Sequence, residues 1–132
     1  MHAPYIIVAE DSEYNQLLFA KMLEQLGYTS DCVGDGEKLI RLLETSSPDL
    51  ILLDIEMPIM NGIEAIIKIR GGKSGAAYNI PIIALTGYDD ESILKKINDS
   101  GFSDYLRKPV TRNMLKEKID LYLNPPKIFF NN

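Results

Sequence analysis

The chain has 132 residues, of which 45% are apolar and 25% charged, values that suit one globular domain with a buried core and exclude wholesale disorder. Its formal net charge of −5 argues against a basic nucleic-acid-binding face. The single cysteine, Cys32, cannot form an internal disulfide, and its apolar surroundings predict a buried, unreactive thiol. The N-terminal segment lacks a signal-peptide pattern and no apolar run approaches the roughly 20 residues of a membrane span, so we expect a cytoplasmic protein without membrane insertion.

In the first half of the chain, apolar runs of strand length alternate with segments of helical period. In chain order the pattern predicts a strand, a helix, a strand and a helix at residues 5–9, 12–26, 29–33 and 36–44. Ser12 is a suitable N-cap for the first helix, and Gly27 ends it. The apolar stripe that this helix is expected to bury comprises Leu18, Phe19, Met22, Leu23 and Leu26.

The second half repeats the alternation three more times. The predicted strands and helices cover residues 50–53, 62–70, 81–85, 90–100, 103–106 and a last helix that Thr111 caps. The glycine-rich segment 71–79 is expected to be a flexible connection. Its Gly-Lys-Ser triplet does not indicate a nucleotide-binding loop, because Ile67 stands where that motif requires glycine and the segment follows a helix rather than a strand.

This alternation predicts an α/β fold with a doubly wound, five-stranded parallel sheet. Strands joined by crossover helices pair in parallel, and helices then cover both faces of the sheet. We expect one domain over residues 1–124, followed by a short C-terminal tail over residues 125–132.

Polar side chains follow four of the five predicted strands. Glu10 and Asp11 follow the first strand, Asp54 the third, Thr86 the fourth and Lys108 the fifth. Ligands of such sheets bind beyond the carboxyl ends of the strands, so these side chains are expected to share one site. Three carboxylates held together favour a hard divalent cation such as Mg²⁺. With the cation, the carboxylate after the third strand becomes a nucleophile toward phosphorus, and the hydroxyl and ammonium groups provide contacts for phosphoryl oxygens.

Four motifs carry a resemblance to a known family: VAED, LLDIEMPIMNG, PIIALTG and YLRKP. Together they resemble the receiver domain of two-component response regulators, over about residues 5–122. The stretches EDSEYNQLLFAKMLEQLGY and SDYLRKPV look most like receivers attached to hybrid sensor histidine kinases. The resemblance implies a flavodoxin-like (βα)5 fold with strand order 2-1-3-4-5.

The resemblance also implies how a metal and a phosphoryl group are bound. Asp54 is expected to accept the phosphoryl group from a phosphohistidine donor. Asp11 and Asp54 would ligate Mg²⁺ directly, Glu10 would do so through water, and Glu56 would contribute its main-chain carbonyl.

Further residues are implied to read and transmit the phosphorylated state. Lys108 would pair with the phosphoryl oxygens, and its bond to Pro109 is expected to be cis. Thr86 would bond to the phosphoryl group after transfer, and Tyr105 would be the switch aromatic that follows it. Such a domain is a signalling switch in a phosphorelay rather than an enzyme acting on other substrates, and it catalyses its own phosphotransfer and dephosphorylation.

The implied partners are a sensor histidine kinase or a histidine phosphotransfer protein, and an effector that meets residues 92–122 around the fifth strand. Direct binding of nucleic acid is not expected. Glu56 and Tyr88 occupy positions that flank the path of hydrolytic water in the family, which leads to the hypothesis that Glu56 tunes the lifetime of phosphorylated Asp54.

Two other functions remain as alternatives. A phosphatase of the haloacid-dehalogenase type also uses an aspartate nucleophile, magnesium and a lysine, but it places Asp-x-Asp after its first strand, whereas Asp54 follows the third strand and position 56 is Glu56. A docking module that is never phosphorylated is the other alternative, and the full set of five strand-end residues argues against it.

Overall fold

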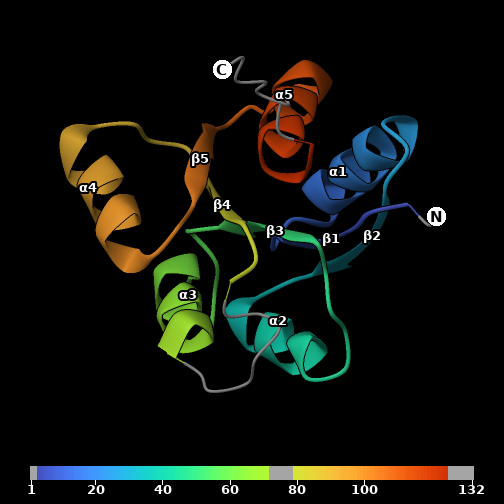
Figure 1. The fold of residues 1–132 in the computed structure, drawn as a ribbon. Coiled ribbons are helices and arrows are strands. Elements are labelled where there is room, and N and C mark those ends of the chain that lie inside the picture. The colour runs from blue at the N-terminus through green and yellow to red at the C-terminus, as the bar shows by residue number, and fades with distance from the viewer. Residues whose placement is uncertain (1–2, 72–78, 125–132) are drawn as a thin grey trace, which may run out of the picture.

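A computed structural model of the chain describes residues 3–71 and 79–124. Five strands and five helices alternate along it (Figure 1). Their bounds are β1 Tyr5–Ala9, α1 Glu13–Gln25, β2 Thr29–Val33, α2 Gly36–Leu43, β3 Leu50–Asp54, α3 Gly62–Gly71, β4 Ile82–Thr86, α4 Glu91–Ser100, β5 Asp104–Arg107 and α5 Arg112–Leu123. Every predicted strand and helix is present, and Ser12 and Thr111 are the N-caps of α1 and α5, as predicted.

The strands form one parallel sheet in the order β2-β1-β3-β4-β5, which confirms the expected topology. The register of the paired strands determines which residues lie side by side at their carboxyl ends. Ala9 pairs with Leu53, so the residues that follow them, Glu10 and Asp54, come next to each other at the end of the sheet. Thr86 pairs with Arg107, so Lys108 emerges at the same edge.

Helices cover both faces of the sheet, as Figure 1 shows with α1 and α5 on one side and α2 and α3 on the other. Alternate residues of the central strands point to opposite faces. Ile7 and Ile51 belong to the core beneath α2, α3 and α4, whereas Ile6 and Leu52 belong to the core beneath α1 and α5. Burial on both faces explains why β1, β3 and β4 read as continuous apolar runs.

A few details differ from the sequence-based expectations. Leu18 was expected in the buried stripe of α1 but is 42% exposed, because the stripe that meets the sheet centres on Phe19 and Leu23. Cys32 was expected to be buried but is half-buried, since β2 is the edge strand. Burial still raises the pKa of its thiol, so the thiol remains largely protonated.

The strand ends, the bond before Pro109, the connection 71–79 and the tail 125–132 were also predicted from the sequence. β3 and β4 each extend one residue further than predicted, to Asp54 and Thr86, because the parallel ladder continues through them. The bond between Lys108 and Pro109 is cis, as the resemblance implied. The expected flexible connection lies almost wholly outside the described residues, and so does the tail 125–132. Within the described part of the chain, no helix combines the length and the apolar character that a membrane span needs.

Candidate functional site

Three carboxylates meet at the carboxyl edge of the sheet. Glu10, Asp11 and Asp54 each place a carboxylate oxygen within 4.8 Å of the others. Glu10 and Asp54 are each only 1% exposed, whereas Asp11 is open to solvent. The chain leaves β1 and turns at once into α1, because the Ser12 side chain accepts a hydrogen bond from the main-chain N–H of Asn15. This abrupt turn keeps Glu10 and Asp11, the two acids that follow β1, close to the end of β3.

A single ammonium group joins two of these acids. Lys108 Nζ lies 2.5 Å from Asp54 Oδ2 and 3.1 Å from Glu10 Oε2. When all three acids are ionised, the three carboxylates and one ammonium carry a net charge of −2. One divalent cation would neutralise that charge, and carboxylate oxygens are the ligands that Mg²⁺ prefers.

Asp54 is fixed by contacts on both sides of its position. The main-chain N–H of Glu56 donates to Asp54 Oδ1 at 2.9 Å. Gly62, the first residue of α3, packs directly against the main chain here: a Cβ at this glycine would clash with the Asp54 carbonyl oxygen and would lie 2.7 Å from the Ile55 Cα. The Glu56 N–H therefore fixes the Asp54 carboxylate, and the start of α3 fixes the main chain of Asp54.

The electrostatics of the cluster follow from burial and from Lys108. Burial, followed by the hydrogen bond to Glu10, raises the pKa of Asp54 from 3.8 to about 7, against the opposing effect of Lys108. Burial opposes ionisation of Glu10 as well, but its hydrogen bonds with Asp54, Asn15 and Lys108 outweigh burial and lower its pKa. Burial also works against the charge of Lys108, yet the two acids more than compensate and raise its pKa. A metal-free site therefore keeps a proton on the acid pair more readily than isolated carboxylates would.

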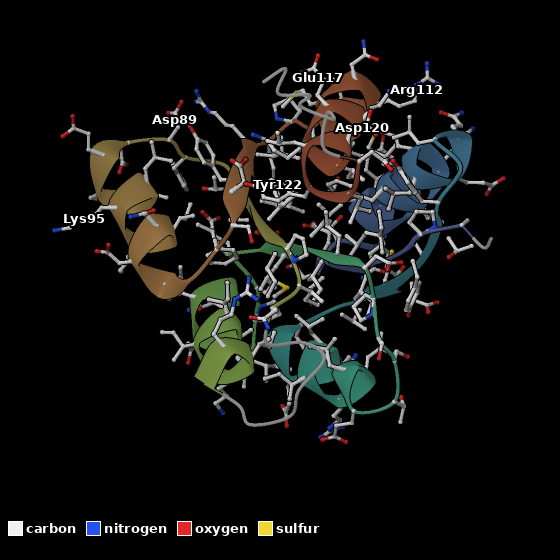
Figure 2. The ribbon with its side chains drawn as sticks, viewed as in Figure 1. Asp89, Lys95, Arg112, Glu117, Asp120 and Tyr122 are labelled. Atoms are coloured by element: carbon white, nitrogen blue, oxygen red, sulfur yellow. The ribbon has the colours of Figure 1, made fainter. Side chains whose placement is uncertain are left out.

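Thr86 is the last residue of β4, at the carboxyl edge of the sheet, whereas Tyr105 lies inside β5, where it pairs with Ala84. Thr86 is fully buried; its hydroxyl donates to the Tyr88 carbonyl at 2.9 Å and accepts from the Tyr88 N–H at 3.1 Å. Tyr105 is 36% exposed. The same loop between β4 and α4 is tied to β5 by Asp89, labelled in Figure 2, whose carboxylate lies 3.1 Å from Arg107 Nη1.

The structure thus gathers Glu10, Asp11, Asp54 and Lys108 at one point and places Thr86 at the same edge. The main-chain N–H of Glu56 is part of this arrangement; the ligand role of its carbonyl stays a prediction.

Two residues of α1 that hold Glu10 were not predicted from the sequence. Asn15 Nδ2 donates to Glu10 Oε1 at 2.9 Å, and Gln16 Nε2 donates to the Glu10 carbonyl oxygen at 2.6 Å. The available signal was their place in the first turn of a helix that begins two residues after the acids. Nothing in the helical period distinguishes such residues from ordinary exposed polar positions.

Comparisons with known proteins agree with this geometry. Residues 6–120 match the response regulator receiver domain family. The chain is 36% identical over 118 residues to the CAI-1 autoinducer sensor kinase/phosphatase CqsS of Vibrio cholerae, and 33% identical over 122 residues to the autoinducer 1 sensor kinase/phosphatase LuxN of Vibrio campbellii. These matches cover 89% and 92% of this chain but only 17% and 14% of the two kinases.

A solved structure is similar over nearly its whole length. The receiver domain of the sensor histidine kinase PA1611 from Pseudomonas aeruginosa superimposes with a TM-score of 0.83 and 32% identity, covering 91% of this chain and 97% of that one. That structure has a magnesium ion coordinated in its active-site cleft. The matched family does not favour the haloacid-dehalogenase alternative. With its sheet order, its cluster of acids and a family match over residues 6–120, this chain belongs to the response regulator receiver domains and is a signalling domain of two-component systems.

Proposed function

We propose that this domain accepts a phosphoryl group from a phosphohistidine donor onto Asp54, in the presence of Mg²⁺ held by Glu10, Asp11 and Asp54. The observation that carries the proposal is the position of Asp54: a buried carboxylate at the end of β3, within 4.8 Å of two other acids and 2.5 Å from an ammonium group. Burying an ionised carboxylate costs free energy unless a nearby positive charge compensates for it, and such clusters are found mainly at functional sites.

The residues present fit the metal. Two acids are buried and one is open to solvent, so an ion can enter while its ligands stay fixed. Asp11 and Asp54 would ligate Mg²⁺ directly, Glu10 through water, and the Glu56 carbonyl would complete the protein ligands. When bound, the ion would neutralise the acids and draw negative charge from phosphoryl oxygens.

The transfer is a substitution at phosphorus. A carboxylate oxygen of Asp54 forms a new P–O bond while the P–N bond to the donor imidazole breaks. The electron pair of the broken bond returns to the imidazole, which leaves as the neutral ring if its other nitrogen carries a proton. Lys108 is placed to hold phosphoryl oxygens beside Asp54, because its ammonium already contacts that carboxylate. The later hydrolysis of the acyl phosphate, also part of the proposal, regenerates the free carboxylate.

Phosphorylation would then change the face formed by α4, β5 and α5. The Thr86 hydroxyl now bonds to Tyr88, and a phosphoryl group on Asp54 would offer it a stronger, charged acceptor. Loss of the bond to Tyr88 frees the loop between β4 and α4 and opens room for the Tyr105 ring to move inward. This change biases two packings of the face that an effector would bind.

The partners follow from the chemistry and from the relatives. A phosphohistidine donor is a sensor histidine kinase or a histidine phosphotransfer protein. Because the chain spans only 17% and 14% of the two autoinducer kinases, their activities do not transfer to it as a whole. We place it, within this proposal, as a receiver of the hybrid-kinase type acting in the cytoplasm, with residues 1–124 as the working domain.

A phosphodonor that needs no partner protein tests the proposal. The purified chain is incubated with MgCl₂ and acetyl phosphate, and its intact mass is followed with time. The expected result is stoichiometric addition of one phosphoryl group, which does not occur when EDTA is present from the start or in Asp54→Asn. No addition to the wild-type chain would favour the docking module. Multiple turnover of unrelated phosphoesters would favour a phosphatase.

A further inference from the structure

The two oxygens of the Glu10 carboxylate are held by partners from different parts of the fold. Oε1 accepts a hydrogen bond from Asn15 Nδ2 at 2.9 Å, and Oε2 lies 3.1 Å from Lys108 Nζ. The main-chain N–H of Ser12 also points at Oε1, at 3.4 Å. The Lys108 ammonium also contacts Asp54, whereas the Asn15 amide donates its hydrogen bond to Glu10.

The first turn of α1 holds Glu10 at its main chain as well as its side chain. Gln16 Nε2 donates to the Glu10 carbonyl at 2.6 Å, while the Asn15 side chain reaches back from the third residue of the helix. A glutamate has one more rotatable bond than an aspartate, so its carboxylate samples more positions unless something fixes it. Asn15 supplies that restraint to the side chain of Glu10, which is only 1% exposed.

We propose that Asn15 is a positioning residue for the metal site: its amide holds the Glu10 carboxylate toward Asp11 and Asp54 and thereby raises the affinity for Mg²⁺. The inference rests on the proposed function, since it concerns the same metal site. Groups that hydrogen-bond to metal ligands orient them, and their loss typically weakens metal binding by about 10-fold or more.

If Asn15 served only to build the helix, its replacement by alanine would leave the affinity for Mg²⁺ unchanged. Within a helix, alanine has a higher intrinsic propensity than asparagine. The main-chain N–H of residue 15 would still bond to Ser12 after substitution, because that bond does not use the side chain. The helix of Asn15→Ala should therefore remain intact, and the loss of the hydrogen bond to the buried Glu10 carboxylate should lower the stability without unfolding the protein. A loss of Mg²⁺ affinity in this folded variant points to Glu10.

The test is a magnesium titration of the full unphosphorylated chain, followed by NMR of ¹⁵N-labelled protein. Four proteins form a double-mutant cycle: wild type, Asn15→Ala, Glu10→Asp, and both changes together. Gln25→Ala is the matched control, because it removes another amide from the far end of the same helix, where Gln25 contacts Arg112 instead of the site. Thermal unfolding without magnesium accompanies each titration.

We expect Asn15→Ala to weaken Mg²⁺ binding about 10-fold, while Gln25→Ala leaves it unchanged. In the Glu10→Asp background, the shorter side chain falls out of reach of the Asn15 amide, so adding Asn15→Ala should change the affinity less than about 2-fold. Unchanged affinity in Asn15→Ala, or an equal loss in both backgrounds, would overturn the inference while leaving the metal site intact. Absence of Mg²⁺ binding in the wild type would instead overturn the proposed function and the inference with it.

Discussion

Asp54 is almost fully buried, yet its carboxyl group must ionise to react as a nucleophile. Its pKa in the fold, about 7, lies above its ordinary value of 3.8, chiefly because of burial. A carboxyl group with a raised pKa holds its proton more tightly when folded than when unfolded. The stability that it contributes is therefore lost as pH rises between those two values. The lowered pKa of Glu10 acts oppositely, but in a lower window, where stability is lost as pH falls below its ordinary 4.5.

We predict that the metal-free protein loses stability between pH 5 and pH 8, by an amount of the order of 1–2 kcal/mol after screening by nearby water. Urea unfolding in EDTA at the two pH values measures it. Asp54→Asn carries no titrating group at this position and should lose most of that dependence. Equal pH slopes in both proteins would show that the proton does not reside on this carboxyl.

Glu56 follows Asp54 by two residues, and its own N–H already binds the Asp54 carboxylate. The side chain of Glu56 is exposed, and the family resemblance implies that it flanks the path of hydrolytic water to a phosphorylated Asp54. We predict that Glu56→Asn, which is shorter and neutral, loses phosphate several-fold faster than the wild type. The decay of the phosphorylated species, followed by intact mass after removal of acetyl phosphate, measures this rate. An unchanged decay would remove Glu56 from the control of lifetime.

At the scale of elements, the junction of β3 with α3 positions the reactive carboxylate. The Cβ introduced by Gly62→Ala would overlap the Asp54 carbonyl and crowd the Ile55 Cα, both of which are main-chain atoms that cannot rotate away. We expect this variant to lose about 1–3 kcal/mol of unfolding free energy and to accept phosphate more slowly. Gly71→Ala, at the other end of α3, is the control, because a Cβ there meets nothing within 4 Å. Equal stability and phosphorylation in the two variants would contradict the role given to this junction.

The loop between β4 and α4 is the element that would carry the signal outward. Its present conformation depends on the pair of hydrogen bonds between Thr86 and Tyr88. Thr86→Ala should still accept phosphate on Asp54 but should show weaker changes in the amide signals of α4 and β5 on phosphorylation, whereas Thr86→Ser, which keeps the hydroxyl, should behave like the wild type. Amide shifts as large in Thr86→Ala as in the wild type would show that the hydroxyl does not couple the site to this face.

For the whole molecule, sequence patterns determine the architecture well because the central strands β1, β3 and β4 lie between covering helices. Runs such as Ile6 to Val8 have no polar face, which requires burial on both sides and hence a parallel sheet with helices on each face. The carboxyl ends of such strands then bring Glu10, Asp54 and Lys108 together, and this placement follows from the sheet order and not from the loop sequences.

Other features depend on three-dimensional contacts that periodicity does not encode. Leu18 fits the apolar stripe of α1 by spacing, but the face of α1 that meets the sheet centres on Phe19 and Leu23 and leaves Leu18 exposed. Asn15 is indistinguishable in sequence from a solvent-facing polar residue, and its hydrogen bond to Glu10 depends on the angle at which α1 leaves β1. Boundaries such as the end of β3 at Asp54 depend on ladder bonds with a strand that comes later in the chain.

The central claim is that a metal-assisted transfer puts one phosphoryl group on residue Asp54 and on no other side chain. It is tested most directly by treating the phosphorylated chain with borohydride, which reduces an aspartyl phosphate to homoserine, and by mapping the modified peptide by tandem mass spectrometry. We expect homoserine at position 54 only, in samples that received both magnesium and acetyl phosphate. Modification at another acid, or none at position 54 in a chain that has gained phosphate, would contradict it.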